Sequence, residues 1–324
     1  MKKKAIKIVF LDAHTLDLGD LDLKPLKSLG DYQAFQCHAK DKLPKEALEA
    51  EILITNKVLF TEKDFRKLSS LKLLCISATG VNNVDLKAAE NHDVGVCNAT
   101  GYSTFGVVEH TLMMMLAFSH RFKEHNEAAL GGTWSNSSSF TLLDFPFTEL
   151  RGKRLGILGY GEIGRALSRV ARALGMEVLI GKIPDRTYGE KPQRVSFHHL
   201  LSNSDFVTLH CPLSEYTKGL IDAKALKLMK EDAYLLNMAR GPIVVEKDIV
   251  DALSKNKLAG YGADVSEVEP PPKNHPFFKK NLQNKIILTP HVAWASRESR
   301  QRLVEELAKN IEAFLKGKKR NRVV

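Results

Sequence analysis

Three segments in the second half of the 324-residue chain each place a reactive side chain shortly after a predicted strand. The side chains are Arg240, Glu269 and His291. Arginine holds carboxylate and carbonyl oxygens with a planar fork of N–H donors, and histidine exchanges protons near neutral pH. A glutamate beside such a histidine favours its protonated form. Together these residue types suit the reduction of a 2-keto acid, in which a bound carbonyl oxygen receives a proton.

Each of the three residues also has an ordinary structural explanation. Arg240 could form a surface ion pair, Glu269 could be a loop charge before Pro270, and His291 could cap a helix. However, the carboxyl ends of parallel strands meet at one edge of a sheet, where open α/β sheets bind their ligands. We therefore interpret the three residues as one catalytic set.

A glycine-rich turn follows the predicted strand Leu155–Leu158 and precedes a predicted helix. It reads Gly159-Tyr160-Gly161-Glu162-Ile163-Gly164, the spacing of a dinucleotide-binding turn in this context. Its glycines allow a tight turn, close approach of a pyrophosphate and close helix packing, and the helix N-terminus attracts the phosphates. Glu162 is expected to face solvent in the first helical turn. With the catalytic set, this turn predicts a nicotinamide-dependent oxidoreductase.

The residues after the next predicted strand, Glu177–Ile180, bear on the choice between NAD and NADP. Gly181 and Lys182 stand where an acid that binds the ribose 2′-hydroxyl of NAD is expected. A cation at this place accommodates a 2′-phosphate, although Asp185 could still fold back onto the ribose. The sequence therefore suggests NADPH and leaves NADH open.

Short apolar runs alternate with helix-like segments in two successive series. The first series contains Ile6–Leu11, Ile52–Thr55, Leu73–Ser77 and Val94–Cys97. The second contains Leu155–Leu158, Glu177–Ile180, Phe206–Leu209, Tyr234–Asn237, Gly260–Ala263 and Ile286–Leu288. Such alternation predicts an α/β protein with two Rossmann-like, doubly wound parallel-sheet domains and a cleft between them. A last helix, Ser296–Leu315, follows the second series and is expected to return to the first domain.

Composition and charge limit the other classes of function. No apolar run reaches the ~18 residues needed to span a bilayer, and the apolar stretch after Lys2–Lys4 is too short for a signal peptide. The four cysteines form no C-x-x-C pair, so no metal site is predicted and a cytoplasmic location is expected. The net charge of +10 is spread along the chain, which favours a solvated surface over nucleic-acid binding.

The glycine turn and the three catalytic segments resemble those of the D-isomer-specific 2-hydroxyacid dehydrogenase family. Members carry an Arg, a Glu and a His in this order, matched here by Arg240, Glu269 and His291, and the resemblance covers essentially the whole chain. It implies a flavodoxin-like substrate domain at 1–103 plus 293–324 and a dinucleotide-binding Rossmann domain at 104–292. It also implies a homodimer through the long helix at 105–121. Lys182 departs from the family pattern, which has an acid there.

The resemblance also implies further binding residues. The loop Ser77–Asp85 is similar to one that binds the substrate carboxylate with backbone N–H groups, here those of Thr79, Gly80 and Val81, while Arg240 and His291 also contact the substrate. Besides the turn 159–164, the implied cofactor contacts are Thr111, Gly181, Lys182, His210, Cys211, Pro212, Thr217, Asn237, Met238, Ala239, Arg240, Asp264, His291 and Ala293.

Three strings resemble the glycerate dehydrogenase, or hydroxypyruvate reductase, group within this family: Leu18–Leu23, Ala78–Asp85 and Thr289–Ser296. They imply reduction of hydroxypyruvate to D-glycerate, or of glyoxylate to glycolate, with no nucleic acid or membrane as partner. The alternative is a dinucleotide-sensing, corepressor-like binding protein on the same fold, because such proteins can retain the catalytic set.

Overall fold

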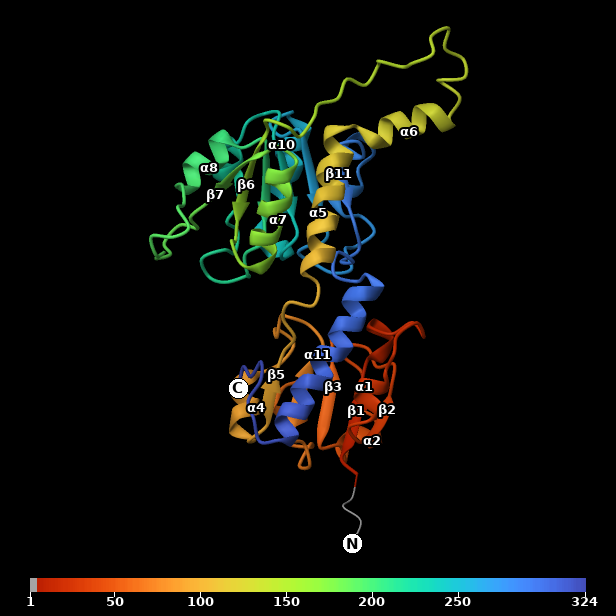
Figure 1. Ribbon diagram of the computed structural model, residues 1–324, viewed down its shortest axis with the longest axis vertical. Coiled ribbons are helices and arrows are strands. Elements are labelled where there is room, and N and C mark those ends of the chain that lie inside the picture. Colours follow the sequence, from red (N-terminus) through yellow and green to blue (C-terminus); the bar gives the residue numbers. More distant parts are fainter. Residues whose placement is uncertain (1–4) are drawn as a thin grey trace. The chain divides into compact units, whose positions relative to one another are not determined.

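The computed structural model describes residues 5–324, which form two compact units (Figure 1). Unit 1 contains the described residues up to Ser103 together with Trp294–Val324, and unit 2 contains Thr104–Ala293. Ala293, expected in the other domain, packs in the core of unit 2 with Val107 and Leu167. The basic residues Lys2–Lys4 lie outside the described part of the chain.

Unit 1 is built on a five-stranded parallel sheet with the strand order β2-β1-β3-β4-β5. Its strands are β1 (Lys7–Phe10), β2 (Asp31–Ala34), β3 (Ile52–Thr55), β4 (Leu73–Ile76) and β5 (Gly95–Cys97). The edge strand β2 was not predicted, because it has no buried residue and its sequence Asp-Tyr-Gln-Ala contains no apolar run. It pairs in parallel with β1, and Lys7 of β1 lies opposite Asp31.

The helices of unit 1 cover both faces of this sheet. They are α1 (Lys24–Lys27), α2 (Lys45–Leu48), α3 (Glu62–Phe65), α4 (Leu86–Asn91) and α11 (Arg297–Leu315), with the short 3-10 turn η1 (Ala13–Thr15). The side chain of Ser296 caps α11 by accepting a hydrogen bond from the Ser299 N–H. The helix buries an apolar face, including Leu303, Leu307 and Ile311, in the same core as residues of β1, β3 and β4.

Unit 2 contains a six-stranded parallel sheet with the order β11-β10-β9-β8-β6-β7. Its strands are β6 (Arg154–Leu158), β7 (Glu177–Ile180), β8 (Phe206–Leu209), β9 (Tyr234–Asn237), β10 (Gly260–Ala263) and β11 (Ile286–Leu288). The strand order reverses between β6 and β8, which creates the crevice where doubly wound sheets bind ligands. The predicted fold class, with two doubly wound parallel sheets, is confirmed.

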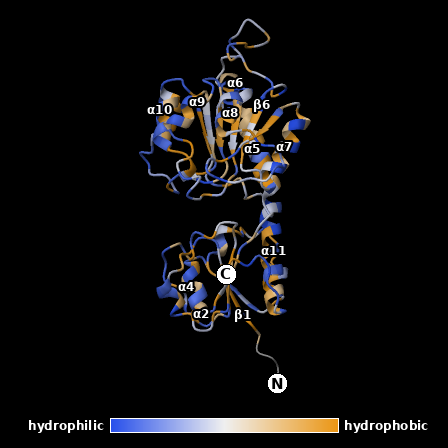
Figure 2. Ribbon diagram, turned by 90° about the vertical axis from the view of Figure 1, so that its left-hand side faces the viewer, coloured by the Kyte–Doolittle hydropathy of each residue, from blue (hydrophilic) through white to orange (hydrophobic). Residues whose placement is uncertain are grey.

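The helices of unit 2 include one that was not predicted, α6 (Phe122–Leu130), which projects from the rest of the unit (Figure 1). The others are α5 (Thr104–Ser119), α7 (Glu162–Ala173), α8 (Phe197–Asn203), α9 (Ala223–Leu228) and α10 (Glu246–Ser254), with the 3-10 turns η2 (Gly241–Ile243), η3 (Pro276–Phe278) and η4 (Lys280–Leu282). Apolar residues concentrate in the strands and on the helix faces that cover them (Figure 2). No helix in residues 5–324 is both long and apolar enough to cross a bilayer.

Candidate active site

The glycine turn joins β6 to α7 and depends on its first and third glycines. Gly159 has a positive φ of 99°, and a Cβ there would overlap the backbone nitrogen of Cys211. A Cβ at Gly164 would overlap the carbonyl oxygen of Gly159. By contrast, a Cβ at Gly161 would meet no heavy atom within 4 Å, so there is open space beside the N-terminus of α7. This space and the free N–H groups of the helix suit a pyrophosphate, and Glu162 is exposed.

A cavity of about 190 Å³ lies against this turn, and we call it the glycine-turn cavity. Seven of its lining residues were expected from the sequence: Gly159, Tyr160, Gly161, Gly181, His210, Cys211 and Pro212. Four were missed: Ile183, Arg186, Tyr188 and Arg194. All four come from the segment between β7 and α8, whose sequence signal is a tyrosine with an arginine on either side.

Backbone hydrogen bonds hold both ends of this segment in place. The Lys182 N–H donates to the Val195 oxygen at 3.0 Å, and the Val195 N–H donates to the Ile180 oxygen at 2.9 Å. Arg194 is therefore held beside the end of β7, where a residue that binds the adenosine ribose is expected. The side chain of Lys182 is exposed, and Lys182 is not among the residues that line the cavity.

The two arginines of the segment flank the ring of Tyr188. The Tyr188 hydroxyl accepts a hydrogen bond from the Ile183 N–H at 3.0 Å, which fixes the ring. The Cζ atom of Arg194 lies 4.6 Å from the ring centroid, and that of Arg186 lies 5.9 Å away. Contacts at these distances are attractive cation–π interactions. They bring two guanidinium groups to the cavity.

His210 also lines the cavity, but as a neutral ring. Burial lowers the pKa of His210 to about 4, because desolvation disfavours the charged form. Its Nε2 lies 2.9 Å from the Thr208 hydroxyl, and its buried Nδ1 has no hydrogen-bond partner among residues 5–324. Positive charge for an anionic ligand therefore comes from Arg186 and Arg194. An unsatisfied buried nitrogen and an open glycine cradle both fit a bound dinucleotide.

Several residues implied as cofactor contacts make hydrogen bonds that shape the surrounding backbone. The buried hydroxyl of Thr111 donates to the Val107 oxygen at 2.6 Å, and that of Thr217 donates to the Pro212 oxygen at 2.7 Å. Asn237 closes the turn after β9, because its Nδ2 donates to the Arg240 oxygen and its Oδ1 accepts from the Ala239 N–H. The cavity lining does not include Thr111, Glu162, Ile163, Gly164, Thr217, Asn237, Met238 or Ala239.

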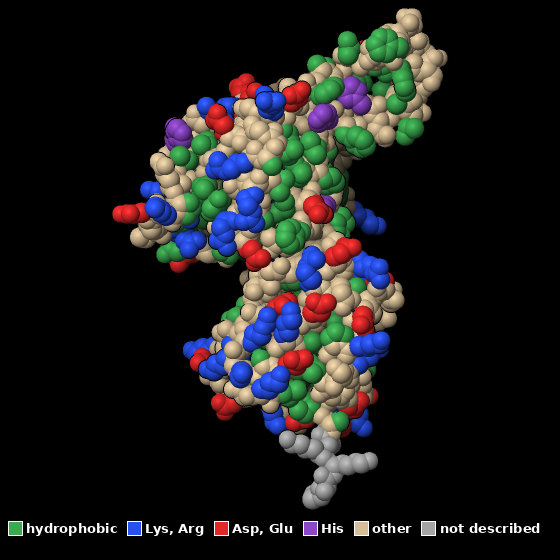
Figure 3. Space-filling view, in the orientation of Figure 1, with side chains coloured by type: hydrophobic (Ala, Val, Ile, Leu, Met, Phe, Trp, Pro, Cys, Tyr) green, Lys and Arg blue, Asp and Glu red, His purple; other side chains and the backbone are tan. Residues whose placement is uncertain are grey.

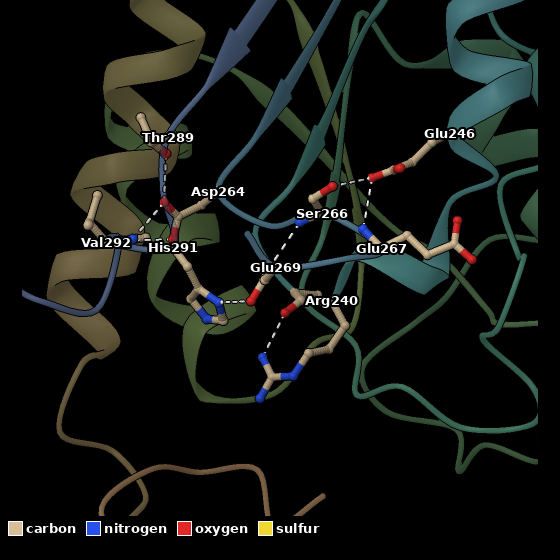
Figure 4. Close-up of polar contacts among 11 residues, drawn as sticks. Arg240, Glu246, Asp264, Ser266, Glu267, Glu269, Thr289, His291 and Val292 are labelled. Atoms are coloured by element: carbon tan, nitrogen blue, oxygen red, sulfur yellow. Dashed lines mark hydrogen bonds and ion pairs between the residues drawn. The ribbon is translucent and has the colours of Figure 1, made fainter. Parts of the chain in front are cut away.

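Arg240, Glu269 and His291 extend from the segments that follow β9, β10 and β11 (Figure 4). The Nδ1 atom of His291 lies 2.7 Å from the Glu269 Oε2 atom, and both side chains are partly exposed. The other Glu269 oxygen accepts from the Ser266 N–H at 3.1 Å. The Arg240 guanidinium donates to the Ala239 oxygen at 2.7 Å. Such a centre can hold an anionic group and exchange one proton with it.

Asp264 shapes the turn that presents His291. Its Oδ1 accepts from the Thr289 hydroxyl at 2.6 Å and the Val292 N–H at 2.8 Å, and its Oδ2 accepts from the Ala293 N–H at 2.8 Å. His291 itself has a positive φ of 56°, a conformation that costs about 1–3 kcal/mol outside glycine. The bonds to buried Asp264 offset this strain.

The loop expected to bind a carboxylate lies in unit 1, after β4. The Thr79 hydroxyl donates to the Ala99 oxygen at 2.9 Å, and the Asn98 side chain donates to the Thr79 oxygen at 2.8 Å. Within residues 5–324, the N–H groups of Thr79, Gly80 and Val81 donate to no acceptor. The loop is thus held from its carbonyl side, and its N–H groups remain available for an anion.

Comparisons with known proteins show what this chain is similar to. The family model described as "D-isomer specific 2-hydroxyacid dehydrogenase, NAD binding domain" matches residues 112–293. A hydroxypyruvate reductase of Blautia hydrogenotrophica is 37% identical over 319 residues, covering 96% of this chain and 98% of the relative. A glycerate dehydrogenase of Methylorubrum extorquens is 36% identical over 321 residues, covering 97% and 98%. The crystal structure of the TT0316 protein from Thermus thermophilus superposes with a TM-score of 0.83 at 32% identity, covering 98% and 99%.

Proposed function

The chain belongs to the D-isomer-specific 2-hydroxyacid dehydrogenase family, and we propose that it reduces hydroxypyruvate to D-glycerate with NADPH. The observation that carries the proposal is the 2.7 Å contact between His291 and Glu269, in the same unit as the glycine-turn cavity. The similarity to a hydroxypyruvate reductase and a glycerate dehydrogenase supports the substrate.

In the proposed mechanism each residue has one task. Arg240 holds oxygens of the keto acid with its guanidinium fork, and the N–H groups of Thr79–Val81 bind the substrate carboxylate. His291 is protonated on both nitrogens, with Nδ1 directed to Glu269, and its Nε2 gives a proton to the carbonyl oxygen. The Glu269 carboxylate stabilises the imidazolium and keeps its orientation. When bound, the dihydronicotinamide supplies the hydride that reduces the carbonyl carbon.

The residues of unit 2 would hold the dinucleotide from several sides. The turn Gly159–Gly164 and the N-terminus of α7 suit its pyrophosphate. Arg186 and Arg194 suit a 2′-phosphate on the adenosine ribose, since an arginine near this position accommodates that group. We therefore assign to these two arginines the task that the sequence suggested for Lys182.

The substrate is tested with hydroxypyruvate, glyoxylate and pyruvate against NADPH and NADH, following absorbance at 340 nm. We expect kcat/KM to be highest for hydroxypyruvate with NADPH. Absence of turnover with all three acids, despite measurable dinucleotide binding, would contradict the proposed enzyme and favour a dinucleotide-sensing binding protein. Turnover of glyoxylate alone would overturn only the choice of substrate.

Arg194→Ala is expected to lower kcat/KM for NADPH by about 10- to 100-fold, because a charged hydrogen bond contributes about 1.5–3 kcal/mol. The same variant should change kcat/KM for NADH by less than about twofold, since NADH lacks the 2′-phosphate. Lys182→Ala is the matched control and should leave both values unchanged. A loss with Lys182→Ala but not with Arg194→Ala would return the selectivity to Lys182.

We further propose that the enzyme is a homodimer that uses α5, α6 and the segment 131–147. Exposed apolar side chains gather there (Figure 3), and large exposed apolar patches mark interaction sites. The most exposed are Phe105, Phe122, Leu130, Phe140 and Leu143. A second copy presents the same apolar surface, so the two surfaces can bury one another about a twofold axis.

The double variant Met113→Glu/Phe122→Glu is expected to yield monomers, because it places two charges in a hollow of α5 and α6 that Met113 and Phe122 both line. Light scattering after gel filtration should give twice the chain mass of 36.2 kDa for the wild type and the single mass for the variant. Leu18→Glu, at an exposed apolar residue of unit 1, is the control and should stay dimeric. A monomeric wild type would refute the dimer.

A further inference from the structure

A buried carboxylate stands behind the candidate catalytic set and has no part in the proposed mechanism. Glu246 is the first residue of α10, and only 9% of its side chain is exposed. Its Oε1 accepts from the Ser266 hydroxyl and the Glu267 N–H, both at 2.8 Å, and its Oε2 lies 2.9 Å from the His275 Nε2 atom. Burial of a charge is costly unless hydrogen bonds compensate it, and three donors do so here.

The surroundings of His275 define which of its nitrogens carries the proton. Its Nδ1 accepts a hydrogen bond from the Phe277 N–H at 3.3 Å and is therefore unprotonated. The proton is then on Nε2 and is donated to Glu246. The ring packs edge-on against Phe277, with centroids 4.7 Å apart, so His275 is a fixed donor.

The Glu246 carboxylate is hydrogen-bonded to both ends of the segment that carries Glu269. Ser266 and Glu267 lie before Glu269 in the chain and His275 lies after it, yet all three bond to the same carboxylate (Figure 4 shows the first two). Ser266 has two roles, because its hydroxyl bonds to Glu246 while its N–H bonds to Glu269. Hydrogen bonds thus run from Glu246 through Ser266 and Glu269 to His291.

The segment that carries Arg240 also packs against Ser266. Gly241 packs so closely on Ser266 that a Cβ at position 241 would overlap the Ser266 carbonyl carbon. A displacement of Ser266 would therefore disturb the backbone next to Arg240 as well as the carboxylate of Glu269. Ser266 is itself only 5% exposed, so it has little room to move.

We propose that Glu246 is a positioning residue for the reaction, which it supports together with His275. By fixing Ser266, the pair holds Glu269 where it can orient the His291 imidazole for proton transfer. This inference rests on the proposed function, because it concerns the same His291 and Glu269. It predicts that substitutions of Glu246 lower kcat because they displace Glu269. Binding of the dinucleotide at the glycine-turn cavity should not change.

The test uses Glu246→Gln and Ser266→Ala in the whole enzyme, each alone and combined with Glu269→Gln. Misplacement of a catalytic group by about 1 Å can cost about 100-fold in rate, so we expect a loss in kcat of about 10- to 100-fold for Glu246→Gln and a smaller loss for Ser266→Ala. KM for NADPH should change by less than about twofold, and in the Glu269→Gln background the further loss in kcat should be below about twofold.

Ser204→Ala is the matched control, because it removes another buried serine hydroxyl of unit 2, which donates to the Leu200 oxygen at 2.7 Å. It should leave kcat unchanged. Should Glu246→Gln fail to fold, Ser266→Ala carries the test, and His275→Gln, which keeps a donor, should retain more activity than His275→Ala. Losses that multiply with that of Glu269→Gln, or an unchanged kcat in both Ser266→Ala and Glu246→Gln, would overturn the inference.

A second measurement separates this inference from the proposed function. Hydrogen exchange in residues 264–270 should accelerate in Glu246→Gln and Ser266→Ala, and not in Ser204→Ala, whichever 2-keto acid the enzyme reduces. Unchanged exchange would refute the positioning role even in an active enzyme. Absence of hydroxypyruvate turnover together with accelerated exchange would refute only the proposed substrate.

Discussion

Replacing His291 by alanine is expected to lower kcat by about 100- to 10,000-fold, the range typical of a lost general acid. The imidazole is the proton donor in the proposed mechanism, and the methyl group of alanine has no proton to donate in its place. The affinity for NADPH should hardly change, because the residues that line the glycine-turn cavity do not include His291. Steady-state turnover and a fluorescence titration with NADPH measure the two quantities.

His199→Ala is a suitable control for this experiment, since His199 is an exposed histidine on α8 of the same unit. It should leave both kcat and NADPH affinity unchanged. An unchanged kcat in His291→Ala would remove His291 from the role of acid. A parallel loss of NADPH affinity would instead indicate that the variant disturbs the turn held by Asp264.

Arg240→Lys is expected to lower kcat/KM for the keto acid by about 100-fold, because lysine keeps the charge but loses the planar fork and one of two charged hydrogen bonds. The position is sensitive for a second reason. The guanidinium is braced by its bond to the Ala239 oxygen and by the Asn237 turn, and a flexible ammonium group does not reproduce that geometry. Turnover against keto-acid concentration, at saturating NADPH, measures the effect.

Arg169→Lys, on the exposed face of α7, is the matched control and should behave as the wild type. The affinity for NADPH should remain within about twofold in both variants, because neither substitution alters a charge. If Arg240→Lys retained full kcat/KM, the fork would not be needed, and a point charge would suffice for the substrate.

Much of the fold could be predicted because it is encoded locally. Strands such as Phe206–Leu209 and Tyr234–Asn237 are short apolar runs between turn residues, and such runs are typical of buried parallel strands. Elements without that pattern were missed. The polar edge strand β2 pairs with the sheet on one side only and needs no apolar run. Helix α6 mixes charged and apolar residues and has one buried residue, Ala128, so its sequence does not stand out from a surface loop.

The sequence by itself determined the family, the glycine turn and the three candidate catalytic residues. Each of these features can be recognised within a short stretch of sequence. A glycine such as Gly159 stands where the turn needs a positive φ, and a reactive side chain such as Arg240 stands shortly after a strand. Only the tertiary structure decided which cations line the glycine-turn cavity and what stands behind Glu269. Arg194 reaches the cavity because Val195 is bonded back to Ile180, and Glu246 reaches Ser266 because α10 packs beside the end of β10. These contacts join residues that are distant in the sequence, and they form only when the chain folds. The residues of one segment therefore do not predict them.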